Sequence, residues 1–135
     1  MKYFFNLISF FMIIFLLCSC SITTTGEEKI GEPSYKIVEY HYLNKYVKEI
    51  YDEKKNDYNR VTYNDGEYCY LIICYGPQPT TGYSIAVKEL YETENTIVVD
   101  TTLKGPLKSD IIEDKESYPA IVIKIDATDK IVIYK

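Results

Sequence analysis

From Arg60 to the C-terminus the chain is a succession of short segments, most of which alternate apolar and polar residues and one of which, residues 68–75, is a continuous apolar run. A period of two places successive side chains on opposite faces of a β-strand, so each segment is expected to be a strand. Turn-forming residues separate the segments, and Asn64-Asp65-Gly66 is the strongest of them, because Asp-Gly supplies the positive φ angles of a hairpin. The strands are expected at residues 61–63, 67–74, 83–91, 96–103, 118–125 and 131–134.

One helix is expected before these strands. Apolar or long side chains follow i, i+3, i+4, i+7 spacing with polar residues between them, which predicts an amphipathic helix over residues 43–54. Its expected apolar stripe consists of Leu43, Tyr46, Val47, Ile50 and the stem of Lys54. Residues 35–40 alternate weakly and are expected to add a strand at a sheet edge.

Together these elements predict a mainly β (α+β) domain. β-Branched residues and tyrosines dominate the strands, and tight turns connect them, which is typical of antiparallel sheets. The expected architecture is an antiparallel sheet or sandwich of six to seven short strands with one N-terminal amphipathic helix.

The N-terminus carries a secretion signal. A single basic residue precedes an almost wholly apolar run over residues 3–17, which is the length of a secretory h-region and short for a transmembrane helix. The run ends in Leu17-Cys18-Ser19-Cys20, which resembles a bacterial lipobox. We therefore expect residues 1–19 to be a lipoprotein signal peptide, Cys20 to be lipidated and residues 20–34 to form a flexible tether. The alternative is an uncleaved signal anchor.

Cleavage before Cys20 would leave 116 of the 135 residues, enough for one domain over residues 35–135. It would also leave Cys69 and Cys74 as the remaining free thiols. They are five positions apart in one expected strand, so they face opposite sides, roughly 16 Å apart at about 3.3 Å per residue. A disulfide needs Cα atoms within about 7 Å, so both thiols are expected to be unpaired and mostly buried.

The charge of the mature chain limits its partners. Without Lys2 it carries 14 basic and 20 acidic residues, a net charge of −6, and it has no basic cluster. This composition argues against nucleic-acid binding and against electrostatic docking on anionic lipid. Attachment to the outer face of the cell membrane is therefore expected to depend on the acyl chains, such as palmitate, carried by Cys20.

Residues suited to catalysis or metal binding are scarce. The one histidine, His41, has no nucleophile in its sequence context, and Cys69 and Cys74 lack C-x-x-C spacing. The acidic run 110–116 has no EF-hand pattern and is interrupted by an isoleucine pair and Lys115. No glycine-rich phosphate loop occurs. We expect a protein that is not an enzyme and that needs no cofactor or metal.

A proline-rich loop between two strong strands is the best candidate for contacts. Two prolines fix φ in the segment Gly76-Pro77-Gln78-Pro79-Thr80-Thr81-Gly82-Tyr83, and its glycines permit conformations that other residues avoid. Rigid exposed loops of this kind are typical of recognition sites, although a stiff connector without a partner is the alternative. The candidate partner-binding residues are Pro79, Thr80, Thr81, Gly82, Tyr83, Tyr118 and Pro119, with Tyr75 beside them.

Residues 76–85 resemble the "G-x-x-P-T-G-G-Y-S-I" segment of PrcB C-terminal domains, the protease-complex subunit PrcB family. Residues 118–125 are similar to the family's "Y-P-Y-x-V-V-K-I", and the resemblance extends over about residues 43–134. The chain departs from the pattern at Thr81, where the family favours glycine, and at Ala120, where it favours an aromatic residue. The resemblance implies a secreted or lipid-anchored, non-catalytic domain that binds and assists a secreted protease or another envelope protein.

A second resemblance implies an alternative function. Residues 79–83 are similar to the "N-P-T-T-G-Y" loop of chagasin-type cysteine-protease inhibitors, which enters a protease cleft. Gln78 replaces the asparagine, the chain has no tryptophan, and the other two inhibitory loops are not found. The alternatives to an accessory subunit are thus an inhibitor that uses this loop and a structural envelope lipoprotein with no specific partner.

Overall fold

The structure, a computed structural model, describes residues 27–135, so the predicted signal peptide and the predicted lipidation site Cys20 lie outside the described residues. The elements, in chain order, are β1 (Tyr35–Ile37), the 3-10 helix η1 (Tyr40–Tyr42), α2 (Lys45–Lys54), β2 (Tyr58–Asn64), β3 (Tyr68–Tyr75), β4 (Ser84–Glu92), β5 (Thr96–Lys104), β6 (Ala120–Asp126) and β7 (Ile131–Tyr134). Within this part of the chain, no helix has the length and apolar character needed to span a membrane.

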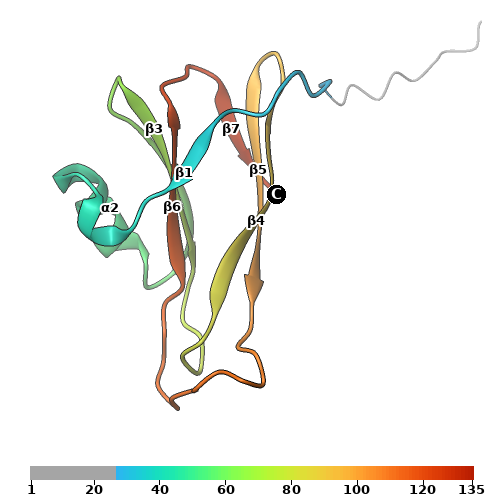
Figure 1. The fold of residues 1–135 in the computed structure, drawn as a ribbon. Coiled ribbons are helices and arrows are strands. Elements are labelled where there is room, and N and C mark those ends of the chain that lie inside the picture. The colour runs from blue at the N-terminus through green and yellow to red at the C-terminus, as the bar shows by residue number, and fades with distance from the viewer. Residues whose placement is uncertain (1–26) are drawn as a thin grey trace, which may run out of the picture.

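The seven strands form two sheets that face each other (Figure 1). One sheet has the order β1-β6-β3-β2 and the other has the order β4-β5-β7. The hairpin predicted around Gly66 joins β2 to β3, and Gly66 has the positive φ of 95° that the turn requires. The prediction of a mainly β domain with one helix near its N-terminus is confirmed, in its sandwich form.

One strand pair corrects the expectation of a purely antiparallel arrangement. β7 runs parallel to β5, with Thr96 opposite Ile131 and Val99 opposite Tyr134. The turn after β6 carries the chain from one sheet to the other at the end where β5 begins, and Ile131 N donates to Asn95 O there at 3.2 Å. Because β5 and β7 leave the same end of the sandwich, they run in the same direction.

β3 is buried on both faces, which explains its continuous apolar sequence. On the inner face, Leu71 and Ile73 pack between the sheets, and on the outer face Ile72 lies under α2. Cys69 belongs to the inner core and Cys74 to the core under the helix, and both are buried and free. The prediction of two unpaired thiols on opposite faces is confirmed.

The helix lies on the four-stranded sheet and buries the expected stripe except at one position, where Tyr51 takes the place expected for Tyr46. Asn44 caps its N-terminus, because its side-chain oxygen accepts a hydrogen bond of 3.0 Å from Val47 N. Val47 is fully buried, and Ile50 and Tyr51 pack beside it. The prediction was wrong for Tyr46, which is mostly exposed, because at 100° per residue the line of contact passes through positions 47, 50 and 51.

Candidate functional site

Two loops meet at one end of the sandwich, at the bottom of Figure 1. The proline loop, residues 76–83, joins β3 to β4, and the long loop, residues 105–119, joins β5 to β6. Their backbones pair directly, since Gln78 N donates to Ser117 O at 2.7 Å and Ser117 N donates to Gln78 O at 3.0 Å. The two loops therefore form one connected surface, which we call the loop end.

The two threonines of the proline loop bind the long loop. Thr81 N donates to Glu113 O at 3.2 Å, and Glu113 N donates to Thr81 Oγ1 at 2.9 Å. Ser117 Oγ donates to Thr80 O at 2.6 Å. The sequence put Thr80 and Thr81 forward as partner contacts, but their backbone groups and the Thr81 hydroxyl hold the neighbouring loop in place.

Gly82 is where the two loops approach most closely. Its φ of +90° is one that only glycine adopts readily, and a Cβ added there would lie 2.8 Å from Cβ of Pro106. The Tyr83 ring lies beside the adjacent residue of the long loop, Gly105. A Cβ built on Gly105 would be 3.9 Å from Cε1 of Tyr83. The predicted rigidity of the proline loop thus depends on its contact with the long loop as well as on its prolines.

The remaining predicted contact residues lie at the base of the loop end. Tyr118 is partly exposed, and its hydroxyl donates to the Glu116 carboxylate, which raises the pKa of Tyr118. Pro119 O accepts from Tyr75 N at 3.0 Å. The Tyr75 hydroxyl is joined to Thr101 Oγ1 at 2.9 Å, so this side chain points between the sheets. Tyr75 is therefore a core-facing residue, whereas Tyr118 has an accessible ring.

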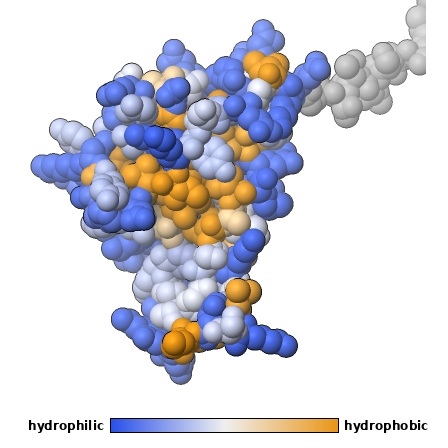
Figure 2. Space-filling model, viewed as in Figure 1, coloured by the Kyte–Doolittle hydropathy of each residue, from blue (hydrophilic) through white to orange (hydrophobic). Residues whose placement is uncertain are grey.

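Sequence reasoning missed the most exposed apolar residues of this end. Leu107, Ile111 and Ile112 are 67%, 95% and 46% exposed, and Figure 2 shows hydrophobic side chains at this end of the molecule. Asp110 fixes their turn, because its Oδ2 accepts from Leu107 N at 2.6 Å while its N donates to Leu107 O at 3.0 Å. An isoleucine pair within a polar connection was the signal that could have revealed them.

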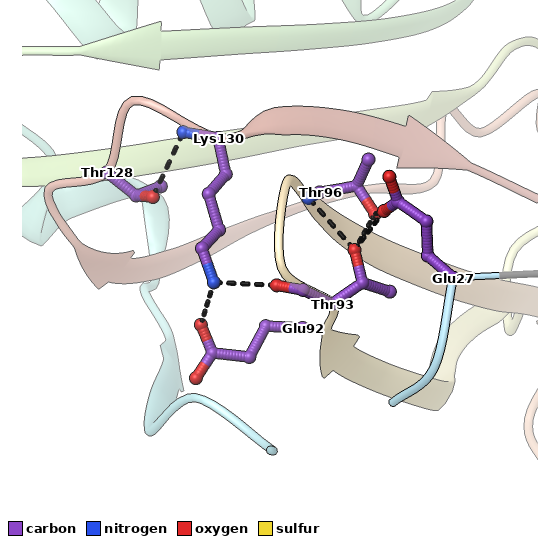
Figure 3. Close-up of polar contacts among 6 residues, drawn as sticks. All are labelled: Glu27, Glu92, Thr93, Thr96, Thr128 and Lys130. Atoms are coloured by element: carbon purple, nitrogen blue, oxygen red, sulfur yellow. Dashed lines mark hydrogen bonds and ion pairs between the residues drawn. The ribbon is translucent and has the colours of Figure 1, made fainter. Parts of the chain in front are cut away.

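The N-terminal segment lies at the opposite end of the sandwich (Figure 1), where it is bonded to the β4–β5 turn (Figure 3). The Glu27 carboxylate accepts hydrogen bonds from the hydroxyls of Thr93 and Thr96 in the β4–β5 turn and from Asn95 Nδ2 at 3.3 Å. These bonds, that of Thr93 first, lower the pKa of Glu27. Thr93 itself is 2% exposed, which makes it one of the two buried polar residues of the described chain.

Backbone bonds and an ion pair strengthen this attachment. Ile30 N donates to Glu92 O and Glu92 N donates to Gly31 O, both at 2.9 Å. Lys130 Nζ reaches from the β6–β7 turn to Glu92 Oε2 at 2.9 Å and to Thr93 O at 2.7 Å. Residues 27–31, which lie within the expected tether of residues 20–34, are thus bonded to the β4–β5 turn.

The side chains suited to metal binding or catalysis lie apart in the described part of the chain. In residues 27–135, no group of three or more His, Cys, Asp or Glu is placed to hold a metal ion. His41 is exposed beside Tyr42 on η1, at a ring-centroid distance of 4.0 Å, and it is remote in sequence from the loop end. The predictions that the protein is not an enzyme and needs no cofactor stay predictions.

Comparison with known proteins gives one family match. Residues 69–126 match the family model described as PrcB C-terminal. The match runs from β3 to the end of β6, so it includes both loops of the loop end. A search of curated proteins and a search of solved structures gave no significant match. Residues 69–126 are therefore similar to PrcB C-terminal domains, in agreement with the resemblance that the proline loop and the segment around Tyr118 carry in the sequence.

Proposed function

We propose that this protein is a lipid-anchored, non-catalytic accessory subunit that binds a secreted protease at the outer face of the cell membrane. The match to PrcB C-terminal supports association with a protease complex. The observation that carries the proposal is the loop end itself, a surface of two loops held together by hydrogen bonds and by the Gly82–Pro106 contact. A surface ordered before binding loses little conformational entropy when a partner docks.

The attachment of the N-terminal segment orients this surface. Glu27 is bonded at one end of the sandwich and the two loops lie at the other (Figure 1). If Cys20 carries the lipid, it lies seven positions before Glu27, a span of at most about 25 Å when fully extended. The lipid would then hold the β4–β5 turn near the membrane, and the loop end would face away from it towards a partner.

Co-purification from the native host tests the binding proposal. The tagged full-length chain is extracted from envelopes in mild detergent, and the bound proteins are quantified by mass spectrometry. A secreted protease should be enriched with the unchanged chain and lost with Gly82→Val, which displaces Pro106 and the long loop. Gly66→Val is the matched control, because Gly66 also has a positive φ, of +95°, but lies in the β2–β3 hairpin with no atom within 4 Å of a built Cβ.

Two results would contradict the proposal. The first is the absence of any enriched protease with the unchanged chain. The second is equal recovery of the protease with Gly82→Val and with the unchanged chain, since binding would then not depend on the loop end.

Metabolic labelling tests the anchor separately. Cells fed radioactive palmitate should label the unchanged chain and should not label the Cys20→Ser variant. Cys18→Ser should still be labelled, because Cys18 lies before the expected cleavage site. Persistent labelling of Cys20→Ser would show that another residue carries the lipid.

The inhibitor alternative predicts a different result. A chagasin-type inhibitor should inhibit a papain-type protease tightly and should lose that inhibition with Thr81→Ala. The hydrogen bonds of Thr81 to the long loop give this side chain a structural role instead. The accessory-subunit proposal expects no inhibition of papain by the full-length chain.

A further inference from the structure

The turn of the long loop exposes apolar side chains to an unusual degree. Leu107, Ile111 and Ile112, which we call the apolar tip, are all exposed, and Ile111 is 95% exposed. Single exposed apolar residues are common on protein surfaces, but three within six positions of one connection are a local concentration of exposed apolar area. The loop that carries them lies at the end of the sandwich opposite the N-terminal segment (Figure 1), and the described chain leaves them 46% to 95% exposed.

The apolar tip projects from a supported turn. Asp110 closes the turn through both its side chain and its backbone. On the other side of the tip, Glu113 and Ser117 are bonded to the proline loop. Backbone groups of Gln78, Thr80 and Thr81 and the Thr81 hydroxyl are used in bonds to the long loop. The proline loop therefore holds the long loop in place, and the long loop exposes the apolar tip.

The charge around the tip indicates what kind of surface it fits. Residues 107–118 contain four acidic and two basic side chains, which gives a net charge of −2. The four acidic residues are all exposed. A partner that covers this segment must match acidic groups at the rim and apolar groups at the centre. Acidic flanks oppose insertion into anionic lipid, so a protein is the better occupant.

We propose that the apolar tip is the anchor of the interface, and that it inserts into an apolar pocket with a basic rim on the partner protein. This inference rests on the proposed function, because it names the contact through which the loop end binds. A projecting group of apolar side chains fits a concave site, and such central apolar contacts account for most of the binding energy of an interface. The residues first put forward, Thr80 and Thr81, act as positioning residues for this tip.

Site-specific photo-crosslinking in the native host tests the contact. Benzoylphenylalanine replaces Ile111 in the full-length chain, and in a control it replaces Ile30, which is 61% exposed at the opposite end. We expect a crosslink to the co-purified partner from position 111 and none from position 30. The crosslinked peptide should be apolar and flanked by Lys or Arg in the partner.

Affinity measurements with the identified partner complete the test. Ile111→Asp should weaken binding at least about tenfold, whereas Ile30→Asp should leave it unchanged. Both side chains are exposed, so neither change should alter folding, which circular dichroism verifies. Gly82→Val, which displaces the support, should weaken binding in the same direction.

Several outcomes would overturn the inference. Unchanged affinity of Ile111→Asp, while the unchanged chain still recovers a protease, would refute the tip but leave the proposed function standing. Failure of the unchanged chain to recover any protease would refute both. A crosslink from position 111 to a second copy of the chain, with a concentration-dependent dimer in sedimentation, would make the tip a self-association site. Flotation of the Cys20→Ser chain with phosphatidylglycerol vesicles, lost in Ile111→Asp, would make it a lipid contact.

Discussion

Replacing Gly82 with alanine tests the close approach that organises the loop end. Two costs arise in the folded protein. The φ of +90° strains an L-residue by about 1–2 kcal/mol, and the new Cβ would lie 2.8 Å from Cβ of Pro106. Since a Cβ contact of that length requires one loop to shift, the overpacking adds about 1–3 kcal/mol. The expected loss in the free energy of unfolding is therefore about 2–5 kcal/mol.

Gly66→Ala carries the first cost alone, so its comparison with Gly82→Ala isolates the second. Gly66 has nearly the same φ, +95°, but a Cβ there would meet nothing within 4 Å. This variant should lose only the backbone term of about 1–2 kcal/mol. The difference between the two variants should be about 1–3 kcal/mol, and each kcal/mol corresponds to about 4–8 °C in Tm for a domain of this size.

Urea unfolding at 25 °C, with the slope m compared between variants, measures these losses. Pro106→Gly removes the Cβ that the methyl group introduced by Gly82→Ala would strike. The doubly substituted chain should therefore lose less stability than the sum of the two single variants, by at least about 1 kcal/mol. Equal losses for Gly82→Ala and Gly66→Ala, or strict additivity with Pro106→Gly, would refute the contact between the loops.

The remaining predictions concern buried groups. Burial raises the pKa of both the Cys69 and the Cys74 thiols, so neither should react with Ellman's reagent at pH 8 until the chain unfolds, and rapid reaction of the folded chain would contradict their burial. Burial also raises the pKa of Tyr134 to about 12. The folded state then binds a proton that the unfolded state releases, so this contribution to stability is complete below about pH 10 and falls by about 1.4 kcal/mol per pH unit up to about pH 12. Tyr134→Phe should show a shallower decline in urea titrations across this range, and an unchanged slope would exclude Tyr134 as its source. Thr93→Val removes the hydroxyl that bonds Glu27 and should speed hydrogen exchange of the Ile30 and Glu92 amides while leaving the β3 amides protected, whereas unchanged exchange would show that the backbone bonds alone hold the segment.

Much of the loop end was accessible from sequence. The proline loop and the segment around Tyr118 carry the motif that the PrcB C-terminal match supports, and both lie at the same end of the sandwich. The role of Thr80 and Thr81 was not accessible, because it depends on hydrogen bonds to residues more than thirty positions away. The exposure of Ile111 was also missed, since an apolar residue in a connection is exposed or buried according to what packs over it.

The sequence by itself determined the local elements. Alternation identified most of the strands, Asp65-Gly66 determined the hairpin, and strand geometry placed Cys69 and Cys74 on opposite faces, because each of these depends on neighbours a few residues apart. Only the tertiary structure decided that β7 joins β5 in parallel, that residues 27–31 are bonded to the β4–β5 turn, and that the proline loop supports the long loop. Those features depend on which strand edges and hydrogen-bonding groups are left free by segments far apart in the sequence. The periodicity of side chains along the chain does not specify which of these distant segments pair.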